Sequence, residues 1–403
     1  MRGMAKRILI LFGALIFAAA IAFFSLAPGY VENALNPLRM PEDGWPVSDN
    51  AQQLHQRLVI GDLHADPLLW DRDLLKRSTR GHTDIPRLLE GNVAVQVLTT
   101  VTKSPRGQNY EENEAGAADN ITPLFIGQLR PVRSWFSLRE RALVQASALN
   151  DMAERAPDRL RVIRSREDLA ELLTARENGQ RILGAVLGSE GGHPLEGDLA
   201  NLDVFFDAGF RLIGLTHFFD NELGGSLHGK GGEGSGLSPF GRQVVTRMIE
   251  KGMIIDLAHA SPRMVEDVLE IEGARPILSH TGIHSHCRTP RNLDDALMLR
   301  IARRGGIVGI GYWSDVVCGT TPADIAAAIE AAVALLGENH VALGSDYDGS
   351  VDAPFDAAHL AALTQALLDR GMSEAQIAKI MGGNMMRHLA ETLPTDGKSV
   401  LAP

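Results

Sequence analysis

The residues that first suggest chemistry are a histidine and an aspartate two positions apart. Residues 59–66 read Val-Ile-Gly-Asp-Leu-His-Ala-Asp, a short apolar run that ends in His64 and Asp66. Side chains two positions apart on a strand point to the same face. The imidazole and the carboxylate can therefore supply the first two ligands of a divalent metal ion. In the alternative interpretation His64 is a packed or capping histidine and Asp66 begins a turn.

The same arrangement recurs along the chain, because further apolar stretches end in a residue that can bind metal or move a proton. These residues are His64 with Asp66, Glu190, His217, His259, His280 and Asp346. Each also has a purely structural interpretation. Glu190 can cap the helix that follows it. His259 can hydrogen-bond to Asp256. His280 can hydrogen-bond to Thr281.

Three histidines and two or three carboxylates that converge without thiolates suit Zn²⁺, Mn²⁺ or Fe²⁺. Five ligands are too many for one catalytic zinc ion, which keeps an open position, but they fit two ions that share a bridging carboxylate. Two such ions can hold a hydroxide between them and polarise a carbonyl group. The set therefore predicts hydrolysis of an amide or an ester.

The elements that would position these residues alternate between strand and helix from residue 51 onward. Strands are expected at 59–64, 92–100, 182–190, 210–217, 253–259, 276–280, 306–313 and 341–346. Helices are expected at 138–155, 167–177, 199–208, 239–251, 262–270, 294–304, 322–336, 357–370 and 374–381. Apolar strands that are each followed by a helix are typical of a parallel sheet covered by helices. Eight such units predict an α/β fold of the closed (β/α)₈ type, with the active site at the C-terminal ends of the strands.

An open, doubly wound sheet is the alternative architecture. Such a sheet normally carries a glycine-rich phosphate loop after a strand, and no glycine fingerprint of that kind follows any strand here. The glycine-dense stretch 224–236 lacks dinucleotide spacing and is interpreted as a flexible loop. Residues 102–136 form a long polar connection.

The N-terminus differs from the rest of the chain. Residues 8–27 are an apolar stretch of 20 residues interrupted only by Gly13 and Ser25, about the length that crosses a bilayer as a helix. Basic residues precede it and acidic residues follow it, so the body should lie on the exported side, periplasmic or extracellular. We expect an uncleaved anchor at 1–27, a tether at 28–50, the barrel at 51–393 and a disordered tail at 394–403. A cleaved signal peptide is the alternative.

The net charge bears on which molecules the protein binds, and the cysteine content bears on whether it contains a disulfide. The formal net charge is −11, with no basic run beyond the first residues, which argues against nucleic acid as the main partner. The two cysteines, Cys287 and Cys318, can pair in an oxidising exported compartment or remain unrelated thiols. The oligomeric state stays open, with a homodimer as one option.

Several motifs in the chain resemble those of the membrane dipeptidase (renal dipeptidase) family, zinc metallopeptidases with a barrel fold. In order they are Val-Ile-Gly-Asp-Leu-His-Ala-Asp, Gly-Ser-Glu-Gly-Gly, Leu-Thr-His, Ile-Asp-Leu-Ala-His-Ala-Ser, Ser-His-Thr and Gly-Ser-Asp-Tyr-Asp-Gly. The stretches 237–241 and 291–293 also match. The resemblance extends from about residue 55 to residue 390.

The resemblance implies two zinc ions per chain. His64 and Asp66 would hold one ion. His259 and His280 would hold the other, and Glu190 would bridge the two.

The resemblance also implies the roles of the remaining residues. His217 would bind the substrate and stabilise its carbonyl oxygen as it becomes an oxyanion. Arg291 would bind the C-terminal carboxylate of a dipeptide, since its planar fork suits a bidentate contact. Asp346 would pass a proton from the metal-bound water to the leaving amine. A disulfide would join Cys287 to Cys318.

One departure from the family pattern concerns the substrate pocket. Residues 218–222 read Phe-Phe-Asp-Asn-Glu, where the family often has an Asn and a Trp-Ala-Asp segment, so the pocket lining should differ while the metal ligands do not. The alternatives to a dipeptidase are another amidohydrolase-like enzyme, acting on acyl-amino acids or lactones, and a non-catalytic surface binding barrel. Arg291 favours dipeptides over the first alternative, and the intact ligand set argues against the second.

Overall fold

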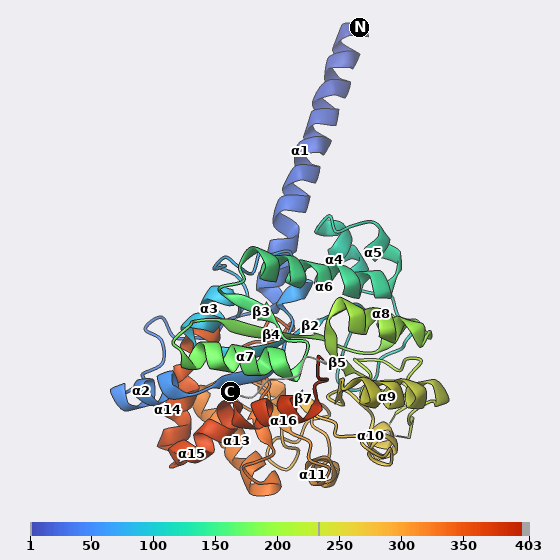
Figure 1. The fold of residues 1–403 in the computed structure, drawn as a ribbon. Coiled ribbons are helices and arrows are strands. Elements are labelled where there is room, and N and C mark those ends of the chain that lie inside the picture. The colour runs from blue at the N-terminus through green and yellow to red at the C-terminus, as the bar shows by residue number, and fades with distance from the viewer. Residues whose placement is uncertain (1, 233, 397–403) are drawn as a thin grey trace.

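The computed structural model describes residues 2–232 and 234–396, and it shows a closed barrel of parallel strands with one long helix projecting from it (Figure 1). The strands are β1 (Ile60–Ala65), β2 (Val93–Thr100), β3 (Leu160–Val162), β4 (Leu183–Ser189), β5 (Phe210–Gly214), β6 (Ile254–Asp256), β7 (Leu278–Thr281), β8 (Val308–Ile310) and β9 (Val341–Leu343).

Apart from α1, which projects from the barrel, the helices cover its outside (Figure 1). Before β4 the helices are α1 (Arg2–Leu35), α2 (Asp49–Arg57), α3 (Ile85–Glu90), α4 (Ile121–Gly127), α5 (Arg133–Phe136), α6 (Leu138–Arg155) and α7 (Arg166–Glu177). After β4 they are α8 (Ala200–Ala208), α9 (Pro239–Lys251), α10 (Pro262–Leu269), α11 (Asp295–Arg303), α12 (Ser314–Val317), α13 (Pro322–Leu336), α14 (Ala361–Asp369), α15 (Glu374–Ala378) and α16 (Asn384–Thr392).

Eight strands form the barrel wall in the order β6-β5-β4-β2-β1-β9-β8-β7, and every paired register between them is parallel. The wall closes between β6 and β7, where the Leu257 amide donates to the Ile277 carbonyl at 2.9 Å and the Ile277 amide donates to the Ile255 carbonyl at 2.9 Å. The predicted (β/α)₈ barrel is therefore confirmed. β3, which the sequence reading did not anticipate, adds to the edge of β4 outside this path.

The eight predicted strands are all present, and each is buried along its whole length, which explains why most of their residues are apolar. Several strands end earlier than expected. β5 ends at Gly214, β6 at Asp256 and β9 at Leu343, so His217, His259 and Asp346 lie in the loops that follow. The apolar character continues into those loops because they are packed inside the rim. Asp346 has a φ of 59°, a left-handed conformation that cannot continue a strand.

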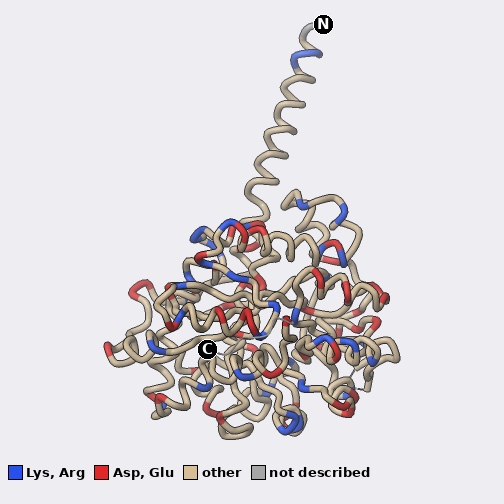
Figure 2. The backbone as a smooth tube through the Cα atoms, in the orientation of Figure 1, with Lys and Arg blue, Asp and Glu red and all other residues tan. Residues whose placement is uncertain are grey.

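The segment expected as a tether is instead attached to the barrel. α1 continues through Pro28 to Leu35, and Glu32 near its end is buried. Beyond the helix, the Arg39 amide donates to the Ala353 carbonyl at 2.8 Å and the Trp45 indole donates to the Pro354 carbonyl at 2.8 Å. Figure 2 shows charged residues along much of the barrel backbone and few along α1. Within the described chain, α1 holds the one helix long and apolar enough to span a membrane.

Two other segments that were expected to be irregular also have defined structure. The described part of the stretch 224–236, which omits residue 233, is held by hydrogen bonds, since the Asp220 carboxylate accepts from the Ser226 amide at 2.8 Å and from the Gly231 amide at 2.7 Å. The long polar connection contains α4 and α5. At the C-terminus the Arg166 amide donates to the Pro394 carbonyl at 3.0 Å, and the rest of the expected disordered tail, from residue 397, lies outside the described residues.

Cys287 and Cys318 form a disulfide that joins the loop after β7 to the end of α12 after β8. The two cysteines are 31 residues apart, and in the chain-entropy account a bond closing such a loop stabilises the fold by about 3–4 kcal/mol. We expect the Cys287→Ser/Cys318→Ser double variant to lose that much free energy of unfolding in denaturant titrations. Reduction of the native protein should lower its unfolding midpoint, whereas reductant should leave the double variant unchanged. An equal response of both proteins to reductant would contradict this assignment.

Candidate metal centre

The structure brings all eight sequence-predicted site residues to the C-terminal rim of the barrel. His64 lies on β1 and His280 on β7, and the others follow strand ends in the connecting loops. Their side chains are all buried. The set consists of His64, Asp66, Glu190, His217, His259, His280, Arg291 and Asp346.

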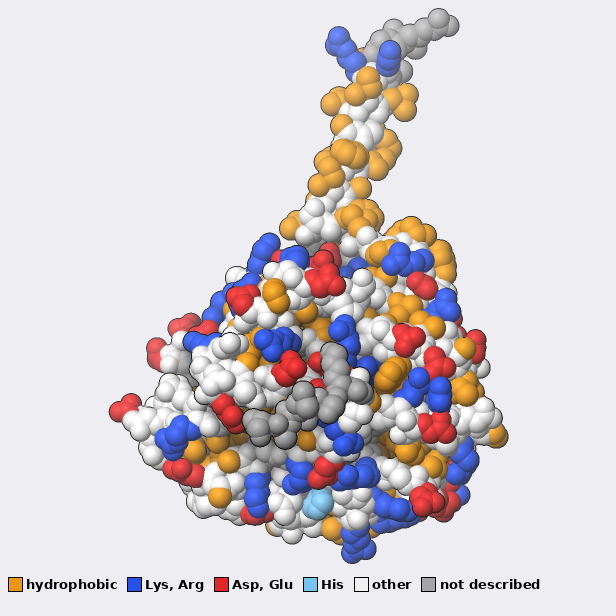
Figure 3. Space-filling view, in the orientation of Figure 1, with side chains coloured by type: hydrophobic (Ala, Val, Ile, Leu, Met, Phe, Trp, Pro, Cys, Tyr) orange, Lys and Arg blue, Asp and Glu red, His pale blue; other side chains and the backbone are white. Residues whose placement is uncertain are grey.

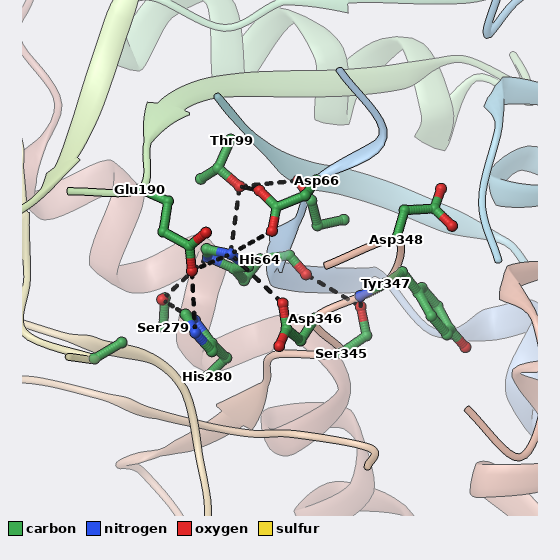
Figure 4. A network of polar contacts seen from close by, with 12 residues as sticks. His64, Asp66, Thr99, Glu190, Ser279, His280, Ser345, Asp346, Tyr347 and Asp348 are labelled. Carbon is green, nitrogen blue, oxygen red and sulfur yellow. Dashed lines mark hydrogen bonds and ion pairs between the residues drawn. The ribbon is translucent and has the colours of Figure 1, made fainter. Parts of the chain in front are cut away.

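The Glu190 carboxylate contacts more imidazoles than any other carboxylate of the cluster, and Figure 4 shows it beside His64 and His280. Its Oε1 atom is 3.4 Å from His64 Nε2, 3.3 Å from His259 Nε2 and 3.5 Å from His280 Nε2. Its Oε2 atom is 3.3 Å from His217 Nε2. One carboxylate therefore contacts imidazoles from four different strand ends. The helical turn after β4 takes no side-chain cap from Gly192, the residue that precedes it, so Glu190 does not serve as the helix cap considered above.

One side of the cluster is rich in carboxylates. His64 Nε2 is 3.3 Å from Asp66 Oδ2 and 3.8 Å from Asp346 Oδ1. These three residues offer ligand atoms that all lie within 4.8 Å of one another. The Thr99 hydroxyl donates to Asp66 Oδ1 and fixes the rotation of that carboxylate. This side therefore offers one imidazole and two carboxylates to a cation.

The other side is rich in imidazoles. His259 Nε2 and His280 Nε2 are 3.0 Å apart, and both point at the same oxygen of Glu190. A second group of possible ligand atoms within 4.8 Å comprises Glu190, His217 and His259. A neutral imidazole that carries its proton on Nδ1 presents a lone pair at Nε2, so the two facing nitrogens and the carboxylate oxygen can all act as ligands of a cation.

Residues behind the cluster orient the imidazoles. The Ser279 hydroxyl lies 2.8 Å from His280 Nδ1 and 3.3 Å from His64 Nδ1, and it donates to Asp256 Oδ2 at 2.6 Å. Asp256 therefore orients the imidazoles through Ser279. His259 Nδ1 has no hydrogen-bond partner among the described residues, so the hydrogen bond to Asp256 considered above is not formed. His280 Nδ1 likewise contacts Ser279 and not Thr281, so neither structural interpretation of these histidines is seen.

The sequence alone did not reveal the supporting roles of Asp62, Thr99 and Ser279, and it suggested a different contact for Asp256. Asp62 accepts hydrogen bonds from the His64 amide at 3.0 Å and from the Ser345 amide at 3.1 Å, which ties β1 to the loop that carries Asp346. Thr99 donates to Asp66, and Ser279 donates to Asp256. Only Asp62 had a usable signal, because it shares a strand face with His64 and Asp66.

Burial sets the protonation pattern of the histidines. Burial and the positive Arg291 hold the pKa of His259 well below its usual range, and burial and His64 do the same for His280. Burial also favours neutral His64, but the Asp66 and Glu190 carboxylates outweigh it and raise the pKa of His64 well above its usual range. Neutral imidazole is the form that binds metal.

The carboxylates repel one another. Burial would raise the pKa of Glu190, but His217, His259 and His64 outweigh it and hold that pKa well below its usual range. Burial raises the pKa of Asp346 well above its usual range, and Glu190 and Asp66 add to the rise against the opposing effect of His64. Three carboxylates and four imidazoles with no thiolate form a donor set that fits borderline-hard divalent cations, so these residues fit a metal centre.

A cavity of about 740 Å³ opens onto the cluster and is lined in part by Asp66, Glu190, His217, His259, Arg291 and Asp346. Arg291 is fully buried in its wall. Its Nη1 donates to the Ala258 carbonyl at 2.9 Å and its Nη2 donates to the His280 carbonyl at 2.8 Å, while Nη2 is 3.5 Å from His259 Nε2. The guanidinium also lies over the Trp313 ring, 5.5 Å from its centroid.

Comparison with known proteins places this geometry in a family. A sequence model of the membrane dipeptidase family (peptidase family M19) matches residues 48–397. A dipeptidase (aclJ) of Aspergillus oryzae is 27% identical over 377 residues, which cover 86% of this chain and 83% of that protein. A dipeptidase (tcpJ) of Claviceps purpurea is 28% identical over 333 residues, which cover 80% of this chain and 72% of that protein.

Solved structures share the fold. The probable dipeptidase PvdM from Pseudomonas aeruginosa superposes with a TM-score of 0.70 at 21% identity, covering 85% of this chain and 98% of that one. A metallopeptidase from Rhodobacter sphaeroides, solved with a phosphinate mimic of the dipeptide L-Ala-D-Ala, superposes with a TM-score of 0.67 at 23% identity, covering 83% of this chain and 99% of that one. Because the family model matches most of the sequence, the chain belongs to the membrane dipeptidase family, peptidase family M19.

Proposed function

We propose that the protein is a zinc dipeptidase with two ions per chain, which hydrolyses dipeptides that have a free C-terminal carboxylate. His64 and Asp66 would hold one ion, His259 and His280 the other, and Glu190 would contact both. The position of Glu190 supports this assignment, because its carboxylate already lies within 3.5 Å of imidazoles on both sides of the cluster. When bound, the ions supply Lewis acidity and lower the pKa of water so that it can attack a carbonyl.

Arg291 is the single observation that favours a dipeptide over other amides or esters. Among the described residues no carboxylate lies within ion-pair distance of its guanidinium. Asp294 and Asp295, the acidic residues that follow Arg291 in the chain, accept hydrogen bonds from the Ala296 and Ser285 amides instead. The carboxylates of Asp346, Glu190 and Asp256 act on Arg291 through their charge without forming an ion pair with it. A buried cation without an anionic partner is costly. A carboxylate on the substrate would supply that partner beside the metal ligands.

Side chains at the rim of the barrel would stabilise the carbonyl oxygen and transfer the proton. With the carboxylate held by Arg291, the scissile carbonyl falls near His217 and Glu190. His217 Nε2 would donate a hydrogen bond to the carbonyl oxygen as negative charge develops on it. Asp346 would take a proton from the attacking water and deliver it to the amine nitrogen as the C–N bond breaks. The products are two free amino acids.

The location of the protein follows from α1. We propose that residues 8–27 anchor the protein in a membrane and that the barrel lies on the exported side. The basic residues before the span support this orientation, and the disulfide fits an oxidising compartment.

The carboxylate contact can be tested with a double-mutant cycle. Arg291→Lys keeps the charge and loses the planar fork, so kcat/KM for a free dipeptide should fall about 10- to 100-fold. The C-terminally amidated dipeptide should be a poor substrate of the native enzyme and should hardly distinguish native protein from Arg291→Ala. Arg288→Lys, on an exposed position of the same loop, is the matched control and should match native protein. If amidation of the dipeptide and Arg291→Ala lower kcat/KM by independent factors that multiply, Arg291 does not bind the carboxylate. The dipeptide assignment then loses its main support.

A further inference from the structure

The last turns of α1 form part of the wall of the catalytic cavity. The cavity that reaches Glu190 and Arg291 is also lined by Phe23, Ala27, Pro28, Val31 and Leu35 of that helix. The inner end of the cavity is therefore polar and charged, and the part of its wall that α1 contributes is apolar. Its volume of about 740 Å³ lies in the range of pockets that enclose drug-sized ligands, which are much larger than a dipeptide of small residues.

Buried polar contacts fix the direction of α1 relative to the barrel. The Glu32 carboxylate is buried and forms ion pairs with Arg72 and Arg80, the second at 2.9 Å. Arg72 in turn pairs with Asp348. Asn36, just after the helix, accepts a hydrogen bond from the Ser350 amide at 2.9 Å. The helix is thus joined to the loop that carries Asp346 and does not act as a free tether.

An apolar face lies beside α1 on the segment formed by α4 and α5. Among the large apolar side chains described beyond α1, the three most exposed are Leu129 (66%), Val132 (59%) and Phe136 (83%), all on this segment. The space-filling view shows apolar side chains on α1 and on the shoulder at its base (Figure 3). Contact between the elements is close, because a Cβ at Gly127 of α4 would meet the Pro28 ring of α1. We name the residues Leu129, Val132 and Phe136 the α4–α5 face.

The length of the apolar span indicates that the bilayer surface lies level with the α4–α5 face. A span of about 20 residues crosses the hydrocarbon core, and residues 8–27 provide it. The span therefore ends at Pro28, where α1 meets α4. The α4–α5 face and the cavity wall both lie at that end of the helix. An exposed apolar surface continuous with a membrane span is best covered by lipid.

We propose that the α4–α5 face lies in the lipid interface and that the catalytic cavity opens at the membrane surface, where it takes dipeptides carrying a long apolar group. The substrate part of this proposal rests on the proposed dipeptidase function, and the docking part does not. The apolar wall from α1 would hold the chain of the substrate. The metal ligands and Arg291 would hold its peptide end.

Docking can be tested with single-cysteine labels on the full-length protein in vesicles of phosphatidylethanolamine and phosphatidylglycerol. The two native cysteines are bonded to each other, so a new cysteine is the one reactive thiol. A fluorophore on Phe136→Cys should lie about 5–10 Å into the headgroup and acyl boundary. It should be quenched by nitroxide lipid and shielded from aqueous iodide. The control is Val59→Cys, exposed at the start of β1 on the opposite end of the barrel, which should show the reverse.

Two results would overturn the docking. Equal iodide quenching at positions 136 and 59 would show that the face is in water. A label at position 136 that is shielded from iodide but not quenched by nitroxide lipid would show that another protein, or a second copy of this chain, covers the face. Neither readout requires turnover, so failure of the docking is distinct from failure of the proposed function.

The substrate part is tested in the same vesicles by comparing Ala-Ala with dipeptides in which one alanine side chain is replaced by a decyl chain. Burial of two methylenes contributes on the order of tenfold in affinity, so at least one chain-bearing dipeptide should have a tenfold higher kcat/KM than Ala-Ala. Val31→Asp should reduce that ratio, and Val204→Asp, on an exposed position of α8, should not. Equal kcat/KM values with active enzyme would overturn the substrate class and leave the dipeptidase function intact. No hydrolysis of any dipeptide by zinc-loaded protein would overturn both.

Discussion

Replacing Glu190 with glutamine should nearly abolish dipeptide hydrolysis and should release at least one metal ion per chain. The variant keeps the shape of the side chain and removes the negative charge that contacts His64, His259 and His280 within 3.5 Å. An amide cannot bridge two cations as a carboxylate does. We expect kcat/KM to fall by more than about 1000-fold, beyond the effect of removing a single electrostatic stabiliser.

The measurement combines steady-state hydrolysis of Ala-Ala with metal analysis of the purified variant. Glu171→Gln, an equivalent change at an exposed position of α7, is the matched control and should retain native activity and metal content. Two tightly bound zinc ions in the Glu190→Gln variant would show that Glu190 does not bridge them, whatever the activity.

Asp346→Asn should reduce kcat by about 100- to 10,000-fold, the range for loss of a general acid and base. Asparagine is among the residues that tolerate a left-handed backbone, so it can adopt the φ of 59° found at this position. The backbone hydrogen bond from the Asp346 amide to the His64 carbonyl, 3.1 Å long, should also survive. The change should therefore remove the proposed proton carrier without disturbing the loop.

Metal content distinguishes this role from a purely structural one. The Asp346→Asn variant should retain its metal ions and its unfolding midpoint while kcat falls. Loss of metal in parallel with activity would instead make Asp346 a required ligand, which its distance of 3.8 Å from His64 Nε2 also permits.

The barrel and the rim residues could be predicted because both leave strong local patterns. Strands buried on both faces are mostly apolar, so a histidine or a carboxylate at the end of such a strand is conspicuous in the sequence. The sequence could not show where each strand ended, because the loops that carry His217 and His259 are themselves buried. It also could not show Ser279 or Thr99 as supporting residues, since an ordinary hydroxyl on a strand gains its role only from partners far away in the chain, such as Asp66 for Thr99.

The N-terminal segment was misjudged for a different reason. The stretch 28–50 contains Pro37, Pro41 and Pro46, and proline disfavours a continuous helix, so the stretch was interpreted as a tether. In the structure the helix continues to Leu35, and its last turn contacts the barrel through the ion pairs of the buried Glu32 with Arg72 and Arg80. Such long-range pairs have no signature in a single sequence. The same is true of the cavity wall that α1 contributes.

Zinc titration of the metal-stripped protein tests the central claim most directly. Hydrolysis of Ala-Ala and bound zinc would be measured together as Zn²⁺ is added. We predict no hydrolysis without metal, full activity near two equivalents per chain, and a rise in the unfolding temperature, since the ions bind the folded site. Metal-free protein that hydrolyses the dipeptide at the full rate would contradict the account.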